Sequence, residues 1–247
     1  MKHAVLAAAA ALALVAPAGL VSPPAQAQQA AGPIATALAD PLRPEADAAR
    51  DALRKPGEII AFAGVEPGMT VIESAPGGGY YTRLLSRVVG PEGKVYALVP
   101  SAFAQREGAL DGLKALAEQY GNVEVVPVDF ANFLLPEQAD LAWTTENYHD
   151  FSNGPNIAGV NTATFAALKP GGTFFVEDHD APGTGTGATR TLHRIDAAAV
   201  KEQVTAAGFA LDAESDLLDN PNDPHDVNPR EVQPTSDKFA LRFRKPV

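Results

Sequence analysis

Cysteine is absent from this chain of 247 residues. Disulfide bonds and thiolate metal sites are therefore excluded, and stability has to come from burial of an apolar core. Basic residues are also scarce, with 19 Lys and Arg against 30 Asp and Glu, a formal charge of −11 at pH 7. A surface of this sign repels phosphate backbones, so we expect no binding to nucleic acid. The length is sufficient for one sizeable α/β domain.

The N-terminus has the three parts of a secretory signal peptide. Met1-Lys2-His3 is a basic start, residues 4–15 are apolar, and Ala25-Gln26-Ala27 is a small-residue cleavage site. The apolar run is shorter than the roughly 20 residues that a membrane span needs. We therefore predict that residues 1–27 are a signal peptide cleaved after Ala27, and that the protein is exported to the periplasm.

After the signal peptide, we predict two parts of the mature chain. Residues 28–42 are rich in Ala, Gln, Gly and Pro, which is typical of a flexible N-terminus. Residues 43–247 are predicted to form one domain. No further run is long and apolar enough to cross a bilayer, so we expect no membrane contact once the leader is removed.

A glycine-rich turn follows the first predicted strand. The β-branched and apolar run at 70–72 ends in Glu73 and Ser74, residues 75–79 read A-P-G-G-G, and a helical apolar period opens at Tyr80. Glycine allows a sharp bend and lets a ligand approach the backbone. The helix start beyond it offers free N–H groups. The pattern therefore predicts a site for a small polar ligand.

This stretch resembles the first motif of class I S-adenosylmethionine-dependent methyltransferases. In that pattern Glu73 matches the acid, Ala75 takes the place of the first glycine, and Gly77 and Gly79 match the other two. Alanine there is tolerable only if its φ is not positive. The resemblance implies that the loop lies under the methionine part of the cofactor and that the acid orders the loop and the amino end. The expected cofactor-binding residues here are Glu73, Ser74, Ala75, Pro76, Gly77 and Gly79.

Two positions depart from related patterns. A dinucleotide fingerprint G-x-G-x-x-G would need glycine where Thr82 stands, which disfavours a nicotinamide-dependent reductase. The second predicted strand, 94–99, ends in Val99-Pro100, whereas the methyltransferase family carries an acid there for the ribose hydroxyls. Loss of that charge-assisted hydrogen bond predicts weaker cofactor binding, unless a backbone group or Ser101 replaces it.

The third predicted strand, 123–128, leads directly into Asp129. The resemblance implies that an acid at this place accepts a hydrogen bond from the adenine amino group. We therefore expect Asp129 and Phe130 to form the adenine end of the cofactor site. As an alternative of equal weight, Asp129 caps the following turn.

The fourth predicted strand, 140–144, runs into the polar cluster 145–151. Open α/β sheets bind ligands at this carboxyl edge. We expect Asn147 to contact the cofactor, and Tyr148, His149 and Asp150 to be catalytic, with His149 as the general base. The alternative is that His149 and Asp150 pack the loop and cap the next helix.

Two further segments bear on the site. Residues 177–180, Glu-Asp-His-Asp, could bind a divalent cation, but side chains alternate along a strand and only half share a face, so we predict no metal site. The charged residues Arg50, Asp51 and Arg54 lie on a predicted helix, 43–54, and Lys55 directly follows it; a solvated helix face is the favoured interpretation.

The order of elements and a helix ended by K-P-G-G before a strand also resemble class I methyltransferases. The likeness extends over 43–244 and is nearest to a group of exported bacterial predicted methyltransferases, through the segments R-D-A-L-R-K-P, A-P-G-G-G-Y-Y-T, N-Y-H-D and T-L-H-R-I-D. It implies an α/β fold: a Rossmann-like, seven-stranded, mostly parallel sheet with helices on both faces and an antiparallel last strand.

The function implied is S-adenosylmethionine-dependent methyl transfer to a small-molecule acceptor, with no oligomeric state assigned. The alternative is an exported binding module that keeps the methyltransferase fold with little or no catalysis. The missing ribose acid favours this alternative, and so does export, because S-adenosylmethionine is made in the cytoplasm.

Overall fold

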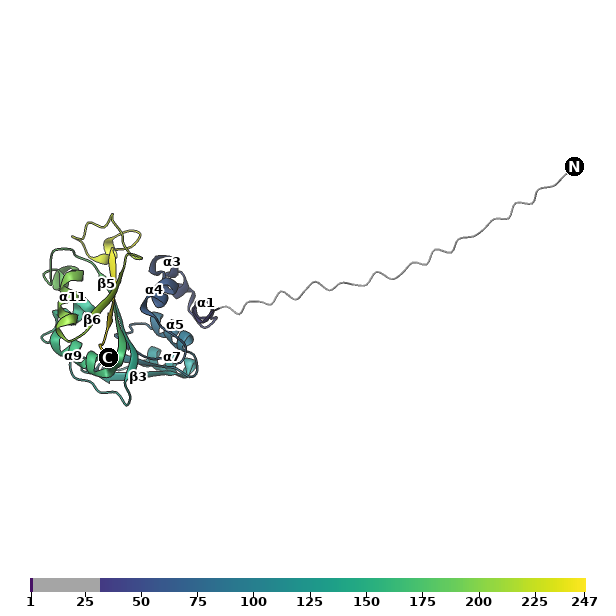
Figure 1. Ribbon diagram of the computed structural model, residues 1–247, viewed down its shortest axis with the longest axis horizontal. Helices are drawn as coiled ribbons and strands as arrows, with labels where there is room; N and C mark the ends of the chain where they lie inside the picture. Colours follow the sequence, from purple (N-terminus) through teal and green to yellow (C-terminus); the bar gives the residue numbers. More distant parts are fainter. Residues whose placement is uncertain (2–31) are drawn as a thin grey trace. The chain divides into compact units, whose positions relative to one another are not determined.

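The computed structural model describes Met1 and residues 32–247 (Figure 1). Apart from Met1, the predicted signal peptide lies outside the described residues, as do residues 28–31. Within the described part, no helix is both long enough and apolar enough to cross a membrane.

The centre of the fold is a seven-stranded sheet in the order β3-β2-β1-β4-β5-β7-β6. β1 pairs in parallel with β2 and β4, and β7 is antiparallel to both of its neighbours, β5 and β6. The predicted fold class is therefore confirmed. The strands are β1 (Thr70–Ser74), β2 (Lys94–Pro100), β3 (Val123–Val128), β4 (Ala139–Thr145), β5 (Leu168–His179), β6 (Ala210–Ser215) and β7 (Lys238–Arg244).

Helices cover both faces of the sheet, with α4, α5 and α7 on one side in Figure 1 and α9 and α11 on the other. The helices are α1 (Pro33–Leu38), α2 (Glu45–Ala48), α3 (Asp51–Arg54), α4 (Pro56–Ala63), α5 (Tyr80–Val89), α6 (Ser101–Ala104), α7 (Asp111–Tyr120), α8 (Tyr148–Asn153), α9 (Ile157–Ala167), α10 (Thr189–Leu192), α11 (Ala197–Ala206) and the 3-10 helix η1 (Pro229–Glu231).

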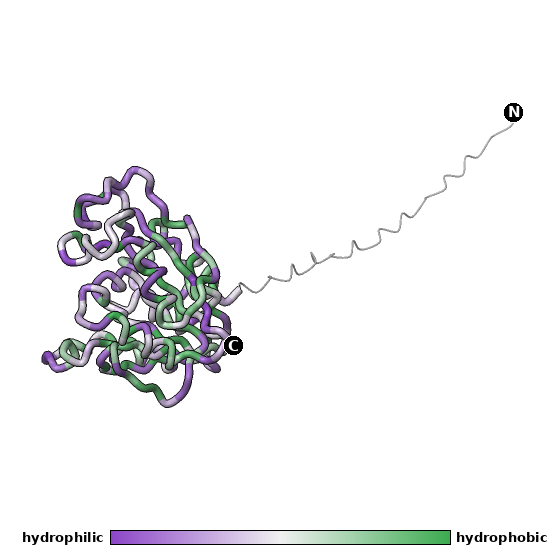
Figure 2. Tube along the Cα trace, turned by 60° about the vertical axis from the view of Figure 1, so that its left-hand side comes forward, coloured by the Kyte–Doolittle hydropathy of each residue, from purple (hydrophilic) through white to green (hydrophobic). Residues whose placement is uncertain are grey.

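The core has two halves because side chains alternate along the strands. In β1, Val71 packs into the half that contains α1, α4 and α5, and Ile72 packs into the half that contains α9 and α11. Figure 2 shows the hydrophobic segments concentrated inside the molecule and hydrophilic segments along the outer turns. The sheet is thus buried on both faces, as a mostly parallel sheet requires.

The prediction of a flexible segment at 28–42 is wrong from Pro33 onward. α1 packs against α5, and Ala37 is fully buried in the core. Asp40 then accepts hydrogen bonds from Arg87 and Tyr120, which ties the segment to the domain. Ile34 and Leu38 pack against the core beside Ala37, so an apolar face is present in a segment whose composition looked disordered.

Two helical segments are interrupted. The predicted helix 43–54 divides into α2 and α3 at Ala49 and Arg50, which keep right-handed backbone angles, and the chain turns after α3 at Lys55, which has φ 43°. The segment 101–120 divides into α6 and α7, with Gly108 at φ 71° in the turn between them. A left-handed residue ends a helix, and Gly108 has that role between α6 and α7.

The strand order reverses direction between β1 and β4. The chain moves from β1 outward to β2 and β3, and then returns to form β4 on the other side of β1. Ligands of open α/β sheets bind at such a switch point, beyond the carboxyl ends of the strands. The ends of β1 and β4 are therefore the place to look for a site.

Candidate functional site

The bend between β1 and α5 exposes bare backbone. Gly77 has φ 56°. Both Gly77 and its neighbour Gly78 are exposed to solvent. No atom lies within 4 Å of a Cβ built on either residue. Gly79, at φ 82°, differs, because its Cβ would lie 2.5 Å from a methyl group of Leu116. The peptide of Gly77–Gly78 is thus the open part of the bend, and Gly79 is packed against α7.

Ala75 has φ 55°, so the condition stated for an alanine at this position, a φ that is not positive, is not met. Its N–H donates to the carbonyl of Leu98 at 2.9 Å, and its own carbonyl accepts from Nδ2 of Asn147 at 3.2 Å. These two hydrogen bonds hold a conformation that costs an alanine about 1–2 kcal/mol. Ser74 and Pro76 on either side are half-buried, and the Pro76 carbonyl accepts from the N–H of Gly79 at 2.9 Å.

Glu73 is buried under this bend with a free oxygen. Its side chain faces α5, and Oε2 has no hydrogen-bond partner among the described residues. Burial raises the pKa of Glu73 to about 7, against the opposing influence of Thr82 and of the Arg83 charge. A buried carboxylate with an unused acceptor is costly on its own, and a ligand ammonium group would complete it.

Asn147 links the bend to the end of β4. Besides the Ala75 carbonyl, its Nδ2 donates to the carbonyl of Thr145 at 2.6 Å. Asn147 also precedes the first residue of α8 and lines the pocket described below. The structure therefore places this predicted cofactor residue where the bend and the pocket meet.

The ribose and adenine ends of the predicted site are less suited to a nucleoside. Val99 is buried with Leu110 and Leu113 in a small apolar cluster, so the end of β2 offers core packing in place of a carboxylate. Asp129 is exposed, and its Oδ1 accepts from the N–H of Ala131 at 3.0 Å, which is the turn-capping alternative. Phe130 packs against Phe151, with ring centroids 4.8 Å apart. The bend after β1 therefore fits the methionine end of the cofactor, whereas the end of β2 has no acidic residue for the ribose.

A pocket of about 520 Å³ opens beside Asn147. Its walls come from α3, from the carboxyl ends of β4 and β5, and from the loop 228–236 before β7. Half of the lining residues carry a charged or imidazole side chain: Arg50, Arg54, Glu146, His149, Asp150, His179, His193, Arg230 and Lys238. A pocket of this composition suits a small polar molecule.

Four ionic side chains form a network at the base of the pocket. Glu146 contacts Arg54 with one oxygen and Lys238 with the other, and Lys238 lies 3.3 Å from Glu177. Burial would raise the pKa of Glu146, but the charges of Lys238 and Arg54 outweigh it and lower that pKa to about 2. Burial and the nearby Glu146 charge raise the pKa of Glu177.

The turn after β4 has a strained backbone at Glu146, a member of this network. Glu146 has φ 55°, a left-handed conformation that non-glycine residues seldom adopt. Arg54 from α3 and Lys238 from β7 both pair with the Glu146 carboxylate and hold it in this conformation. The three residues join segments that are far apart in sequence at the base of the pocket. Such strained residues cluster at functional sites.

His149 is held by a buried carboxylate on β5. Its Nδ1 lies 2.8 Å from Oδ1 of Asp178, and its backbone N–H donates to Oδ2 at 2.7 Å. Burial lowers the pKa of His149, but the hydrogen bond and charge of Asp178 outweigh it, so the net pKa is raised. Because Asp178 occupies Nδ1, Nε2 is the ring nitrogen available to the pocket, and this arrangement can accept a proton there.

The three residues predicted as catalytic separate in the structure. Tyr148 is fully buried, and its hydroxyl accepts a hydrogen bond from Asn161 at 2.8 Å, so its predicted position facing an acceptor is wrong. A helix beginning at Tyr148 turns successive side chains by about 100°, which places that ring in the core. His149 and Asp150 line the pocket, and His193 joins them from the end of α10.

The segment 177–180 does not converge on a cation. Glu177 faces Lys238, Asp178 faces His149, and Nδ1 of His179 lies 2.7 Å from Oγ of Ser236. Asp180 accepts from backbone N–H groups of Ala181 and Ala197. Burial lowers the pKa of His179 to about 4, so this imidazole is neutral at pH 7. Alternation along β5 distributes the four side chains among different partners.

Several site residues were not identified from the sequence. Arg54 was expected in solvent, but its side chain is 15% exposed and pairs with Glu146. Lys238 gave no local signal, because a long irregular loop precedes β7. Asp178 could have been found from β5 alone, since alternation places it on the face opposite Glu177 and at the edge where β4 ends.

Solved structures with this arrangement of elements provide the comparison. A SAM-dependent methyltransferase from Aquifex aeolicus superposes with a TM-score of 0.60 and 20% identity over 80% of this chain and 93% of its own. A Burkholderia thailandensis 1,6-didemethyltoxoflavin-N1-methyltransferase, with bound S-adenosylhomocysteine, gives 0.55 and 17% over 79% of each chain.

A third solved structure with this fold is that of a cyclase. The 4+2 cyclase SpnF has a TM-score of 0.61 and 15% identity over 79% of this chain and 82% of its own. No protein-family model matches the chain. At these identities the likeness defines the architecture: the chain has the fold of the class I S-adenosylmethionine-dependent methyltransferases.

Proposed function

We propose that the protein is an S-adenosylmethionine-dependent methyltransferase that acts on a small-molecule acceptor. The observation that carries the proposal is the open Gly77–Gly78 peptide above the buried Glu73, whose Oε2 lacks a partner among the described residues. A ligand with an ammonium group and a polar chain would satisfy both features. The fold supports the proposal, because structures of this architecture include methyltransferases.

The residues of this chain divide the work between two adjoining sites. Glu73 and the Gly77–Gly78 peptide would hold the methionine end of the cofactor, and Asn147 would join that site to the acceptor pocket. The bound cofactor supplies a methyl group on a sulfonium leaving group. The pocket then has to align the acceptor and remove its proton. We propose that Nε2 of His149 takes that proton; the contact of Nδ1 with Asp178 and the position of His149 in the pocket lining support this.

Titration with S-adenosylhomocysteine tests the proposal, with two matched glycine variants. Gly77 and Gly64 both have positive φ and no atom within 4 Å of a built Cβ, but Gly64 ends α4 away from the bend. Both Gly77→Val and Gly64→Val should lose similar stability. Only Gly77→Val should lose affinity, because its side chain fills the open bend. Equal affinities in the two variants, or no binding to the unmodified protein, would contradict the proposal.

A binding module without efficient catalysis is the second candidate. The buried Val99 favours it, because the end of β2 offers no carboxylate to a ribose. The cyclase among the similar structures also indicates that this architecture serves more than one chemistry. The two candidates differ in one measurement: a methyltransferase binds S-adenosylhomocysteine in the micromolar range, whereas the module does not bind it at millimolar concentration.

We also propose that the protein is exported and cleaved after Ala27. The basic start, the apolar run and the A-x-A site of residues 1–27 support this. N-terminal sequencing of the protein recovered from the producing cell tests it. The expected mature N-terminus is Gln28, and recovery of Met1 in the cytoplasmic fraction would contradict export.

A further inference from the structure

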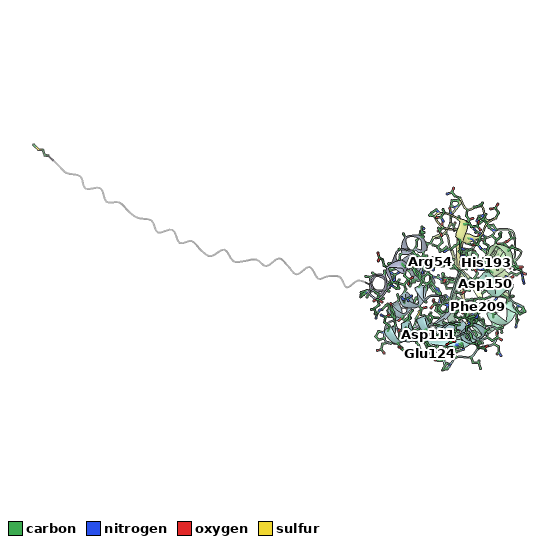
Figure 3. All side chains as sticks on the ribbon, turned by 180° about the vertical axis from the view of Figure 1, so that it is seen from behind. Arg54, Asp111, Glu124, Asp150, His193 and Phe209 are labelled. Atoms are coloured by element: carbon green, nitrogen blue, oxygen red, sulfur yellow. The ribbon has the colours of Figure 1, made fainter. Side chains whose placement is uncertain are left out.

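Three metal-ligating side chains meet at the wall of the pocket. His149 Nε2 lies 3.6 Å from Oδ1 of Asp150, and His193 Nδ1 lies 3.7 Å from the same oxygen. One ligand atom from each residue lies within 4.8 Å of the other two. Figure 3 shows the labelled Asp150 and His193 next to each other. The three come from the first turn of α8 and from the end of α10, which are far apart in sequence.

The spacing is close to that of a tetrahedral ion. Bonds of about 2.0–2.2 Å to tetrahedral Zn²⁺ place ligand atoms roughly 3.3–3.6 Å apart. The separations of 3.6 and 3.7 Å from the Asp150 oxygen are near this range, and the two imidazole nitrogens lie within 4.8 Å of each other, so side-chain movement has to complete the geometry. The side chains of Asp150 and His193 are 54% and 51% exposed, so they have room to move. Three protein ligands leave the fourth position open to the pocket, as in catalytic zinc sites.

The supporting contacts are those of a metal-binding histidine. Asp178 is fully buried and holds Nδ1 of His149 at 2.8 Å, which directs the lone pair of Nε2 toward Asp150. A carboxylate behind a ligating imidazole is the usual second contact of metal sites. His193 adopts φ 54° at the end of α10, a strained conformation that brings its ring edge-on to His149, with centroids 5.4 Å apart.

We propose that His149, Asp150 and His193 bind one divalent transition-metal ion of the zinc class. Two neutral imidazoles and a carboxylate suit such an ion better than Mg²⁺ or Ca²⁺, which prefer oxygen ligands. Of the cations that line the pocket, Arg50, Arg54 and Lys238 are each paired with a carboxylate, which reduces the charge that opposes an ion.

The role of the ion, though not its binding, rests on the proposed function. A zinc-class ion with an open position would bind an acceptor oxygen and lower its pKa, so that the proton of the acceptor would pass to solvent water in place of a protein base. Nε2 of His149 cannot hold an ion and a proton at the same time. The acceptor therefore loses its proton either to His149 or with the help of the ion, and not by both routes at once. The acceptor class that the ion selects carries a hydroxyl or a carboxylate group.

Metal binding can be measured on its own, without cofactor or acceptor. The purified protein is treated with a chelator, dialysed, and titrated with Zn²⁺ by calorimetry and with Co²⁺ by visible absorption. We expect one ion per chain with a dissociation constant in the micromolar range or below, and Co²⁺ bands typical of tetrahedral coordination. His193→Ala and Asp150→Ala should weaken binding by at least about tenfold, and Asp178→Asn by about 10–100-fold.

His225→Ala is the matched control. His225 also pairs with a carboxylate, Asp237 at 2.8 Å, but it does not line the pocket. This variant should bind the ion like the unmodified protein, and circular dichroism establishes that each variant is folded. The proposal is overturned if no stoichiometric ion binds, or if binding is the same in His193→Ala and Asp150→Ala as in the unmodified protein. Titration of the metal-free protein with S-adenosylhomocysteine reports separately on the proposed function.

Discussion

Arg194 and Asp223 form an ion pair of 2.9 Å in which both side chains are fully buried. Arg194 also donates from Nε to the carbonyl of Val227 and from Nη1 to the carbonyl of Asp180. One arginine therefore fastens the segment after β5 to the long loop between β6 and β7. Because residues 228–236 of that loop form a wall of the pocket, the pair supports the site without contacting it.

Asp223→Ala should lower the free energy of unfolding by about 3–5 kcal/mol, because it leaves the Arg194 charge buried and unpaired. Urea unfolding measures this loss. The control is Asp212→Ala, which breaks the more exposed pair with Arg242, where Nε lies 2.6 Å from the carboxylate. That change should cost no more than about 1 kcal/mol. Equal losses in the two variants would contradict a structural role for the buried pair.

Glu73→Gln should stabilise the protein at alkaline pH and weaken binding of S-adenosylhomocysteine. The pKa of Glu73 is raised from 4.5 to about 7 by burial, so the folded state prefers the protonated carboxyl. Its contribution to stability is complete below about pH 4.5 and is lost as the pH rises through 7. Removing the charge should therefore add on the order of 2–3 kcal/mol at pH 8 and little at pH 4.5.

Thermal unfolding at a series of pH values checks the Glu73 prediction, with Glu92→Gln on the exposed turn before β2 as the control. The control should differ from the unmodified protein by less than about 0.5 kcal/mol at every pH. If Glu73→Gln is less stable than the unmodified protein at pH 8, the carboxylate has a partner that the structure does not show.

Ala75→Gly and Gly77→Ala should change stability in opposite directions. Both positions have positive φ, 55° and 56°, and Gly77 has open space around it. Glycine at 75 relieves the strain and should raise the free energy of unfolding by about 0.5–1 kcal/mol, whereas alanine at 77 introduces the same strain and should lower it by a similar amount. Urea unfolding of the two variants measures both changes. A loss of stability in Ala75→Gly would show that the alanine methyl group contributes packing that outweighs the strain.

The sequence predicted the sheet well because each of its strands is a local pattern. The run at 123–128 matches β3 at both ends, the run at 140–144 lies within β4, and the bend after Glu73 lies where its glycines indicated. The parallel order and the antiparallel β7 did not follow from any pattern. They came from the resemblance to a known fold, and the strand pairing confirms them.

The pocket was harder to predict because its members meet through the fold. Arg54, Glu146 and Lys238 lie in three segments separated by 92 positions in each step, and no local pattern relates them. Tyr148 and His149 are neighbours in sequence, yet one faces the core and the other the pocket, because α8 begins at Tyr148 and successive helical side chains point about 100° apart. The position of residues 145–151 at the carboxyl edge of the sheet identified the region of the pocket. Which side chains of that region face the pocket and which face the core is seen only in the structure.

Asp178→Asn should lower the pKa of His149, because it removes the charge that holds Nδ1. The raised pKa of His149 gives a contribution to stability that is complete below its unfolded value of about 6.5 and is lost as the pH rises through the folded value. In Asp178→Asn this contribution should disappear, so the stability of the variant should approach that of the unmodified protein as the pH rises from 6 to 9.

Nuclear magnetic resonance of the imidazole protons measures the His149 titration directly in chelator-treated protein, and urea unfolding measures the linked stability. Asp237→Asn is the matched control, because it removes the carboxylate partner of His225 and leaves His149 unchanged. If His149 titrates at the same pH in both variants, Asp178 does not set its proton affinity. In that case Asp178 would serve to position the His149 ring for a ligand. The geometry would then no longer support His149 as the base that deprotonates the methyl acceptor.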